Sequence, residues 1–281
     1  MHIDAHQHFW NYSANPSDYV WMTERYASLR RNYAPADLRP LLEESGFGGS
    51  VAIQAREMHC ETDYLLDLAS QEPSILGVVG WVDLCDPDAE RHLDRFSASP
   101  WLKGFRMLVH DRADTGFAAS EAHVRGVKLL EAYGLTYDLL IRPQHIDAAI
   151  QLVDLCPGQR FVVDHLAKPD IKAGVLEPWR SRLRELARRP HVFCKLSGMV
   201  TEADWDAWRP QDLHPYLDCV LEAFGAARLM IGSDWPVSTC AASYGATMKV
   251  VVDWTTKLSA DEREAILGRT CDSFHRLGGT S

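Results

Sequence analysis

Two histidines separated by one residue stand near the start of the chain, in the segment MHIDAHQHFW. We predict that His6 and His8 share one face of a first strand with Asp4, because alternate residues of a strand point to the same side. Two imidazoles that converge in this way suit a divalent metal, or two hydrogen-bond donors directed at one oxygen atom. The motif alone is only moderately specific, because paired histidines also occur as ordinary core or surface residues.

A third histidine and an aspartate stand at the ends of two later predicted strands. His165 ends a strand predicted over 160–165, on the same face as Val163, and Asp234 follows a strand predicted over 228–233. Histidines with a carboxylate are a common ligand set for a first-row metal and leave one position open for water. The predicted catalytic and metal-binding residues are therefore His6, His8, His165 and Asp234.

Further polar and aromatic side chains are expected around this centre, because the other predicted strands also end in polar residues. A site surrounded by so many polar side chains suits a polyhydroxylated or anionic substrate. Lys195, near the end of the seventh strand, has two readings: it faces the site, or it pairs with a strand carboxylate inside the barrel. The predicted substrate-binding residues are Gln54, Arg106, Lys168, Trp21 and His110.

Short apolar runs that recur along the chain are the elements that would position these residues. Several are continuous, which is typical of strands buried on both faces in a parallel sheet. Eight such strands are predicted, over 2–9, 49–54, 75–82, 102–107, 135–141, 160–165, 191–197 and 228–233.

Amphipathic helical patterns fill the gaps between these runs. We predict helices over 36–47, 62–71, 87–97, 120–133, 143–155, 178–188, 215–224, 244–258 and 259–277. Eight strand–helix repeats predict an α/β fold, a single (β/α)₈ TIM-type barrel over residues 1–281. A doubly wound sheet is the alternative, but the chain lacks the glycine-rich turn that usually follows its first strand. The aromatic segment 10–35 is a long first βα loop, and such loops line the active face of a barrel.

The composition is that of an ordinary globular enzyme, with 46% hydrophobic and 24% charged residues over 281 positions. A formal net charge of −10 makes nucleic acid an improbable partner, because phosphate binding requires a positive surface. The partner we expect is a small molecule, and oligomeric state is not readable from the sequence.

The seven cysteines are scattered and form no CxxC pair, which argues against a disulfide framework and a cysteine zinc site. Reduced, mostly buried thiols are the expectation. No apolar run approaches the roughly 18 residues of a membrane span, and the N-terminus lacks the pattern of a secretory signal. A cytoplasmic protein is therefore expected.

Several motifs, in order along nearly the whole chain, resemble the amidohydrolase superfamily, in particular the amidohydrolase-2 branch that holds sugar-lactone hydrolases. The motifs are IDAHQHFW at 3–10, KGFRM at 103–107, DHLAKPD at 164–170, CKLSGM at 194–199 and MIGSDWPV at 230–237.

This resemblance implies a catalytic centre of His6, His8, His165 and Asp234, in an enzyme similar to those that open L-fucono- and L-rhamnono-lactones. The fifth strand offers no histidine, and the fourth carries Arg106 where a carboxylated lysine would stand. One divalent metal, with zinc the first choice, or none fits this pattern better than a bridged pair.

The expected reaction is lactone hydrolysis, in which Asp234 activates water and a metal or the imidazoles polarise the carbonyl group. Three alternatives stay open: a metal-dependent decarboxylase of an aromatic acid, a lactonase of an aromatic-catabolism lactone, and a non-catalytic barrel that binds a sugar or a metal.

Overall fold

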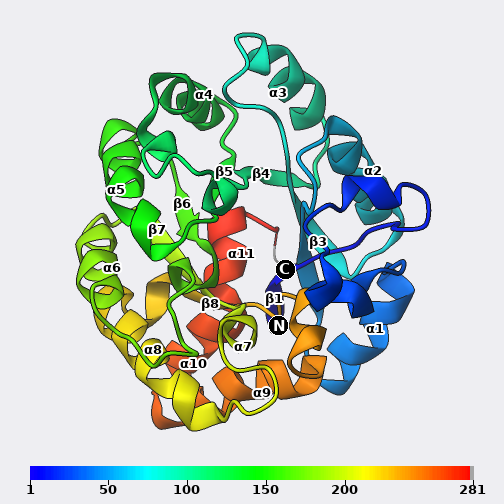
Figure 1. The fold of residues 1–281 in the computed structure, drawn as a ribbon. Helices are drawn as coiled ribbons and strands as arrows, with labels where there is room; N and C mark the ends of the chain where they lie inside the picture. The colour runs from blue at the N-terminus through cyan, green and yellow to red at the C-terminus, as the bar shows by residue number, and fades with distance from the viewer. Residues whose placement is uncertain (279–281) are drawn as a thin grey trace.

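Eight parallel strands surround the centre of the molecule, in the order β1 to β8 (Figure 1). The structure, a computed structural model, describes residues 1–278. The strands are β1 Ile3–Gln7, β2 Gly49–Ile53, β3 Ile75–Gly80, β4 Leu102–Met107, β5 Thr136–Leu139, β6 Phe161–Val163, β7 Val192–Leu196 and β8 Leu229–Ile231. The predicted (β/α)₈ barrel is thereby confirmed.

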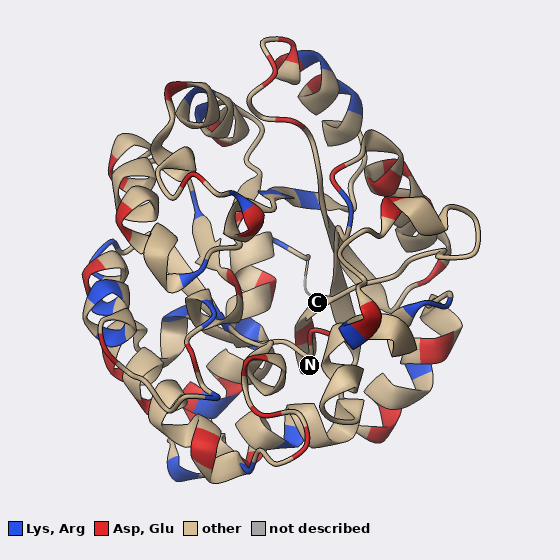
Figure 2. Cartoon of the chain, viewed as in Figure 1, with Lys and Arg blue, Asp and Glu red and all other residues tan. Residues whose placement is uncertain are grey.

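Most helices lie outside the strands as a ring, and α11 lies towards the centre of the view (Figure 1). They carry charged residues of both signs (Figure 2). The helices are α1 Pro35–Glu44, α2 His59–Gln71, α3 Ala89–Ser97, α4 Glu121–Ala132, α5 Ile146–Leu155, α6 Trp179–Ala187, α7 Met199–Glu202, α8 Pro210–Phe224, α9 Tyr244–Trp254, α10 Ala260–Glu264 and α11 Thr270–His275. None of the described helices is long and apolar enough to cross a membrane.

Backbone hydrogen bonds close the barrel between its first and last strands. Gln7 pairs with Trp235 in parallel, and the amide of His8 donates to the carbonyl oxygen of Trp235 over 2.7 Å. The amide of Asp234 donates to the carbonyl oxygen of His6 over 2.8 Å. This seam holds the backbone of the paired histidines against the segment that carries the aspartate.

The apolar core has two layers. One lies inside the barrel, where Val51, Val79 and Met230 meet Phe274 of α11. The other fills the space between the strands and the ring of helices, and Phe161 belongs to it. Parallel strands covered on both faces explain why the sequence shows continuous apolar runs.

The observed elements are shorter than predicted at most ends, but α2 and α8 are longer because they begin earlier. The predicted helix 215–224 begins at Pro210 instead. Proline is favoured at the first position of a helix, and the amide of Arg209 donates to the Asp212 carboxylate over 2.8 Å, which caps this end. Pro215, taken as the start, lies inside the helix. Ser259 begins the last helical segment with a capping box, because its hydroxyl accepts from the amide of Glu262 over 3.3 Å and its amide donates to the Glu262 carboxylate over 3.0 Å.

The long first loop is anchored at its base. Trp10 and Tyr33 exchange two backbone hydrogen bonds, of 3.0 and 2.9 Å, so the loop returns to where it left the barrel. Two short 3₁₀ turns, Pro16–Asp18 and Glu24–Leu29, lie between these residues. The loop is therefore a compact cover over the barrel mouth.

Gly126 in α4 provides a test of this packing. A Cβ at this position would lie 1.9 Å from the carbonyl oxygen of Leu84. We expect Gly126→Ala to lower the free energy of unfolding by about 1–3 kcal/mol through overpacking, although alanine favours helices by about 1 kcal/mol. Urea unfolding midpoints measure the effect.

The matched control is Gly245→Ala in α9. Its added Cβ meets no atom closer than 3.8 Å, and the residue is exposed. We expect its midpoint to equal or exceed that of the unmodified protein. Equal midpoints for the two variants would contradict the tight approach of α4 to Leu84.

Candidate active site

The first strand is irregular where it delivers the paired histidines. Its register against β2 shifts between Asp4 and Gln7. The Asp4 carboxylate accepts hydrogen bonds from the amide of Ser233 over 2.8 Å and from the hydroxyl of Tyr244 over 3.3 Å. Asp4 therefore points towards α9, and the prediction that it shares a face with His6 is wrong, because a bulge interrupts the alternation.

His165 reaches the site by a different route from the one predicted. The strand β6 ends at Val163, which packs in the outer core layer. Residues His165 to Lys168 then all have positive φ, between 50° and 59°. The predicted shared face of Val163 and His165 is wrong, because this left-handed turn redirects the chain. The amide of Lys168 closes the turn by donating to the carbonyl oxygen of His165 over 2.7 Å.

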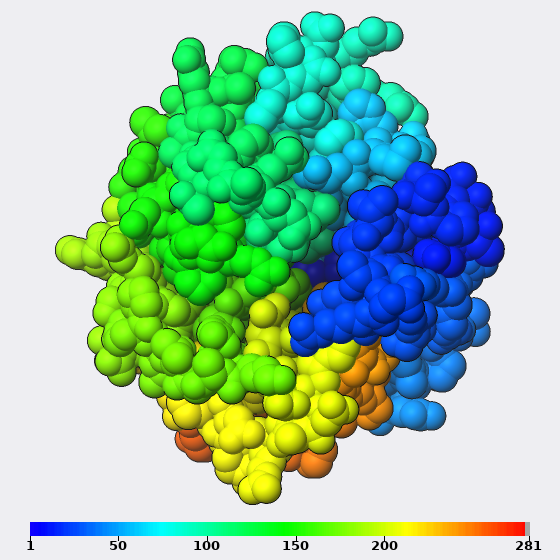
Figure 3. All heavy atoms as spheres, viewed as in Figure 1, coloured from blue at the N-terminus to red at the C-terminus, as the bar shows by residue number. Residues whose placement is uncertain are grey.

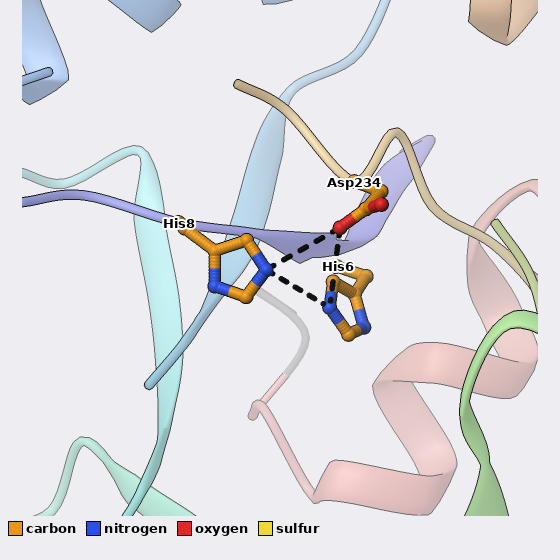
Figure 4. A group of neighbouring side chains, drawn as sticks. All are labelled: His6, His8 and Asp234. Atoms are coloured by element: carbon orange, nitrogen blue, oxygen red, sulfur yellow. Dashed lines mark hydrogen bonds and ion pairs between the residues drawn. The ribbon is translucent and has the colours of Figure 1, made fainter. Parts of the chain in front are cut away.

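Asp234 is the point on which the imidazoles converge (Figure 4). Its Oδ1 lies 3.3 Å from Nε2 of His8 and 3.8 Å from Nε2 of both His6 and His165. The Nε2 atoms of His6 and His8 are 3.3 Å apart. All four side chains are almost fully buried. The four residues singled out in the sequence are thus brought together.

The Nδ1 atom of each ring, on the side away from Asp234, contacts a neighbouring polar group. His8 Nδ1 donates to the carbonyl oxygen of Ile53 over 2.8 Å, and His165 Nδ1 lies 2.8 Å from the hydroxyl of Ser197. Nδ1 of His6 lies 3.4 Å from a carboxylate oxygen of Asp164. Such contacts orient metal-binding imidazoles and leave Nε2 free as the ligand.

The spacing of these atoms fits a divalent metal. A tetrahedral ion with bonds of about 2.0–2.1 Å holds its ligands about 3.3–3.4 Å apart. Within the group of His6, His8 and Asp234, two of the three distances between ligand atoms are 3.3 Å, and the distance from His6 Nε2 to Asp234 Oδ1 is 3.8 Å. A second possible group replaces His8 and Asp234 by Asp164 and His165. It fits less well, because Asp164 already faces two cations.

A layer of buried charges lies beneath the imidazoles. Each of four neighbouring strands contributes one residue to this layer, at or just after its end. They are Arg106 of β4, Asp138 of β5, Asp164 just after β6 and Lys195 of β7. Lys195 contacts both carboxylates, at 3.1 Å for Asp164, and Arg106 donates to Asp164 over 2.9 Å. The alternative reading of Lys195, as the partner of a strand carboxylate inside the barrel, is confirmed.

Burial and this charge layer shift the pKa values of the site. Burial would raise the pKa of Asp164, but Lys195, His6 and Arg106 together hold it well below 3.8. Burial lowers the pKa values of His6 and His165 well below 6.5, so both rings are neutral near pH 7.

The Asp234 carboxyl is ionised in this setting. Burial alone would raise its pKa, but the neighbouring rings of His165 and His8 lower it below 3.8. The site thus combines neutral imidazoles with a carboxylate, which is the protonation state required of metal ligands.

A cavity of about 440 Å³ opens above these residues. Figure 3 shows the face hollowed near its centre, beside the dark-blue first loop. Four of the five predicted substrate-binding residues line the cavity, and Gln54 does not. Gln54 lies beside Arg106 and accepts a hydrogen bond from the guanidinium over 2.9 Å. The lining residues from the prediction are Trp21, Arg106, His110 and Lys168.

Other residues of the site have no role in the sequence-based prediction. Asp164 is the main omission: it directly precedes His165, and strict alternation along a strand would turn it away from the site. Tyr26 and Glu202 also line the cavity, and Glu202 accepts from Lys168 over 2.8 Å. Only their places in loops after strand ends could have indicated them.

The chain matches known proteins over nearly its whole length. It is 41% identical to an L-fucono-1,5-lactonase from Burkholderia multivorans, over 99% of this chain and 96% of that protein. It is 36% identical to an L-fucono-1,5-lactonase from Burkholderia ambifaria, over 98% and 95% of the two chains. A crystal structure of an amidohydrolase from Burkholderia multivorans with bound zinc has a TM-score of 0.94 and 40% identity, covering 99% of each chain.

A family model described as amidohydrolase matches residues 3–271. This range includes all eight strands and every residue that converges on Asp234. The chain belongs to the amidohydrolase family.

Proposed function

We propose that the protein is a lactonase that opens a sugar-acid lactone, with L-fucono-1,5-lactone or a related aldonolactone as substrate. The observation that carries the proposal is the carboxylate of Asp234, which faces three imidazole Nε2 atoms at the floor of a polar cavity. The choice of substrate is supported by 41% and 36% sequence identity to two L-fucono-1,5-lactonases, over 99% and 98% of this chain.

Asp234 acts as the general base. Its Oδ1 faces the imidazoles, so Oδ2 is left to accept a proton from the attacking water. The water oxygen bonds to the lactone carbonyl carbon, and the bond to the ring oxygen then breaks. Asp234 returns the proton to the departing ring oxygen, which becomes a hydroxyl group of the open acid.

The imidazoles would hold a divalent metal, for which we propose zinc. His6, His8 and Asp234 would be its ligands, with His165 beside them. When bound, the metal supplies Lewis-acid polarisation and lowers the pKa of bound water. The rings suit this role better than direct donation to the carbonyl oxygen, because His8 donates its Nδ1 proton to Ile53 and turns Nε2 towards Asp234.

The cavity walls orient the substrate. Lys168 presents hydrogen-bond donors, Arg106 contributes a positive charge, and Trp21 presents an aromatic wall. Gln54 acts indirectly, by positioning Arg106: its side-chain and backbone oxygens both accept hydrogen bonds from the guanidinium. Fixed donors of this kind place the carbonyl carbon near the base and convert binding into orientation.

A panel of lactones tests the proposal, because each ring opening releases a proton that a pH indicator detects. We expect turnover of fucono-, rhamnono-, galactono- or arabinono-lactone, and none of a pyrone dicarboxylate. Asp234→Asn should lower kcat/KM by about 10²–10⁴-fold, the usual contribution of a general base.

Asp170→Asn is the matched control, because it removes another carboxylate that lines the cavity. We expect its activity to change by at most a few-fold. Normal turnover by Asp234→Asn would reject the assigned base. Release of carbon dioxide from an aromatic acid, without any lactone turnover, would indicate the decarboxylase instead.

The pH dependence follows from the directions of the pKa shifts. Protonation of Asp234, His6 or His165 removes the active form, and all three pKa values lie below their usual ranges. We therefore expect kcat/KM to stay constant from pH 8 to pH 6 and to fall only at lower pH, after subtraction of spontaneous hydrolysis. A decline centred near pH 6.5 would contradict neutral, buried imidazoles.

Metal binding can be measured without turnover. Elemental analysis after dialysis against zinc should give one ion per chain, and His8→Ala should weaken zinc binding at least 100-fold, because it removes a ligand. His145→Ala is the control, since this histidine lies outside the cavity lining. Unchanged affinity in His8→Ala would place the metal elsewhere.

A further inference from the structure

The guanidinium of Arg106 reaches the atom at which a metal would bind. Its Nη1 lies 3.3 Å from Nε2 of His6 and donates to Asp164 over 2.9 Å. A guanidinium has only donors, so it presents an N–H group to Nε2. Nε2 of His6 therefore carries the lone pair, and the ring proton is at Nδ1.

The other side of the His6 ring supports this tautomer. Nδ1 lies 3.4 Å from Oδ1 of Asp164, and an ionised carboxylate only accepts hydrogen bonds, so Nδ1 is the donor in this contact. Lys195 Nζ is also 3.3 Å from Nδ1 and contacts the carboxylates of Asp138 and Asp164. The lone pair of His6 thus faces the centre and Arg106.

Arg106 is not free to turn away. Its Nη2 donates to the side-chain and backbone oxygens of Gln54, and its Nε lies 3.3 Å from the same side-chain oxygen. The side chain is 3% exposed. A fixed positive charge therefore stands beside a ligand of the proposed metal.

A divalent cation on His6 Nε2 would share that lone pair with the guanidinium. It would also lie within a few ångströms of a charge of the same sign, in a site with little water to screen the repulsion. A guanidinium keeps its proton in proteins, so the repulsion cannot be relieved by deprotonation.

We propose that Arg106 limits the metal affinity of this centre, by competing with a divalent cation for the Nε2 lone pair of His6. Arg106 acts through His6 and the local field, as a positioning residue, in addition to lining the cavity. The inference rests on the proposed function only in taking this centre as the metal site. It implies a zinc ion that exchanges more readily than the ligand set alone would give.

The test compares the zinc dissociation constants of variants by competition with a chelator in titration calorimetry. Arg106→Gln removes the charge, and we expect zinc to bind at least tenfold more tightly. Arg106→Lys keeps a positive charge at the same place, and its affinity should stay within about threefold of the unmodified protein. Circular dichroism and unfolding midpoints check that each variant is folded.

Gln54→Ala is the second variant, in case Arg106→Gln does not fold. It removes the side-chain oxygen that holds the guanidinium, so Arg106 can withdraw and zinc affinity should rise by a smaller factor. Unchanged or weaker zinc binding in the folded charge-removing variant would overturn the proposal, because a merely structural arginine would leave affinity equal or lower.

These outcomes are separate from those of the proposed function. Zinc affinity is measured without substrate, so a protein that opens no lactone can still show the effect of Arg106. Loss of zinc binding in His8→Ala, together with no gain in Arg106→Gln, would keep the metal site and reject the role of Arg106 alone.

Discussion

The seam that closes the barrel is the constraint on which the site depends. Two backbone hydrogen bonds join the strand of His6 and His8 to the segment of Trp235 and Asp234. Because backbone bonds fix both segments, the base and the paired imidazoles keep their spacing without any bond between their side chains. Side chains on fixed strand ends are held more accurately than side chains on free loops.

The buried charges follow from this arrangement. The site must keep a carboxylate ionised beside neutral imidazoles, with little water present. A buried charge is costly unless neighbouring groups pair with it and form hydrogen bonds to it. Arg106 and Lys195 offset Asp138 and Asp164 among themselves, so the layer under the site is balanced. Removing one member would leave an unpaired buried charge, which is far more costly than replacing a whole pair.

The sequence predicted the barrel because eight apolar runs alternate with amphipathic ones, and it predicted the centre because four reactive side chains follow strand ends. It did not predict that Asp4 faces away from His6, or how the chain turns to deliver His165. The bulge beside Asp4 and the left-handed turn at His165 are departures from the period of two, and nothing in that period signals them. The position of Gln54 outside the cavity lining was not predictable either, because a residue that faces substrate and one that faces another side chain look alike at a polar strand end.

The left-handed turn at 165–168 lowers the stability of the fold but fixes the position of His165. Non-glycine residues in this conformation each cost about 1–2 kcal/mol, and Leu166 and Ala167 adopt it while fully buried. Glycine at Ala167 would relieve this cost, yet it would also give the chain freedom just after His165. Directed evolution for thermal tolerance and directed evolution for turnover would therefore pull this position in opposite directions.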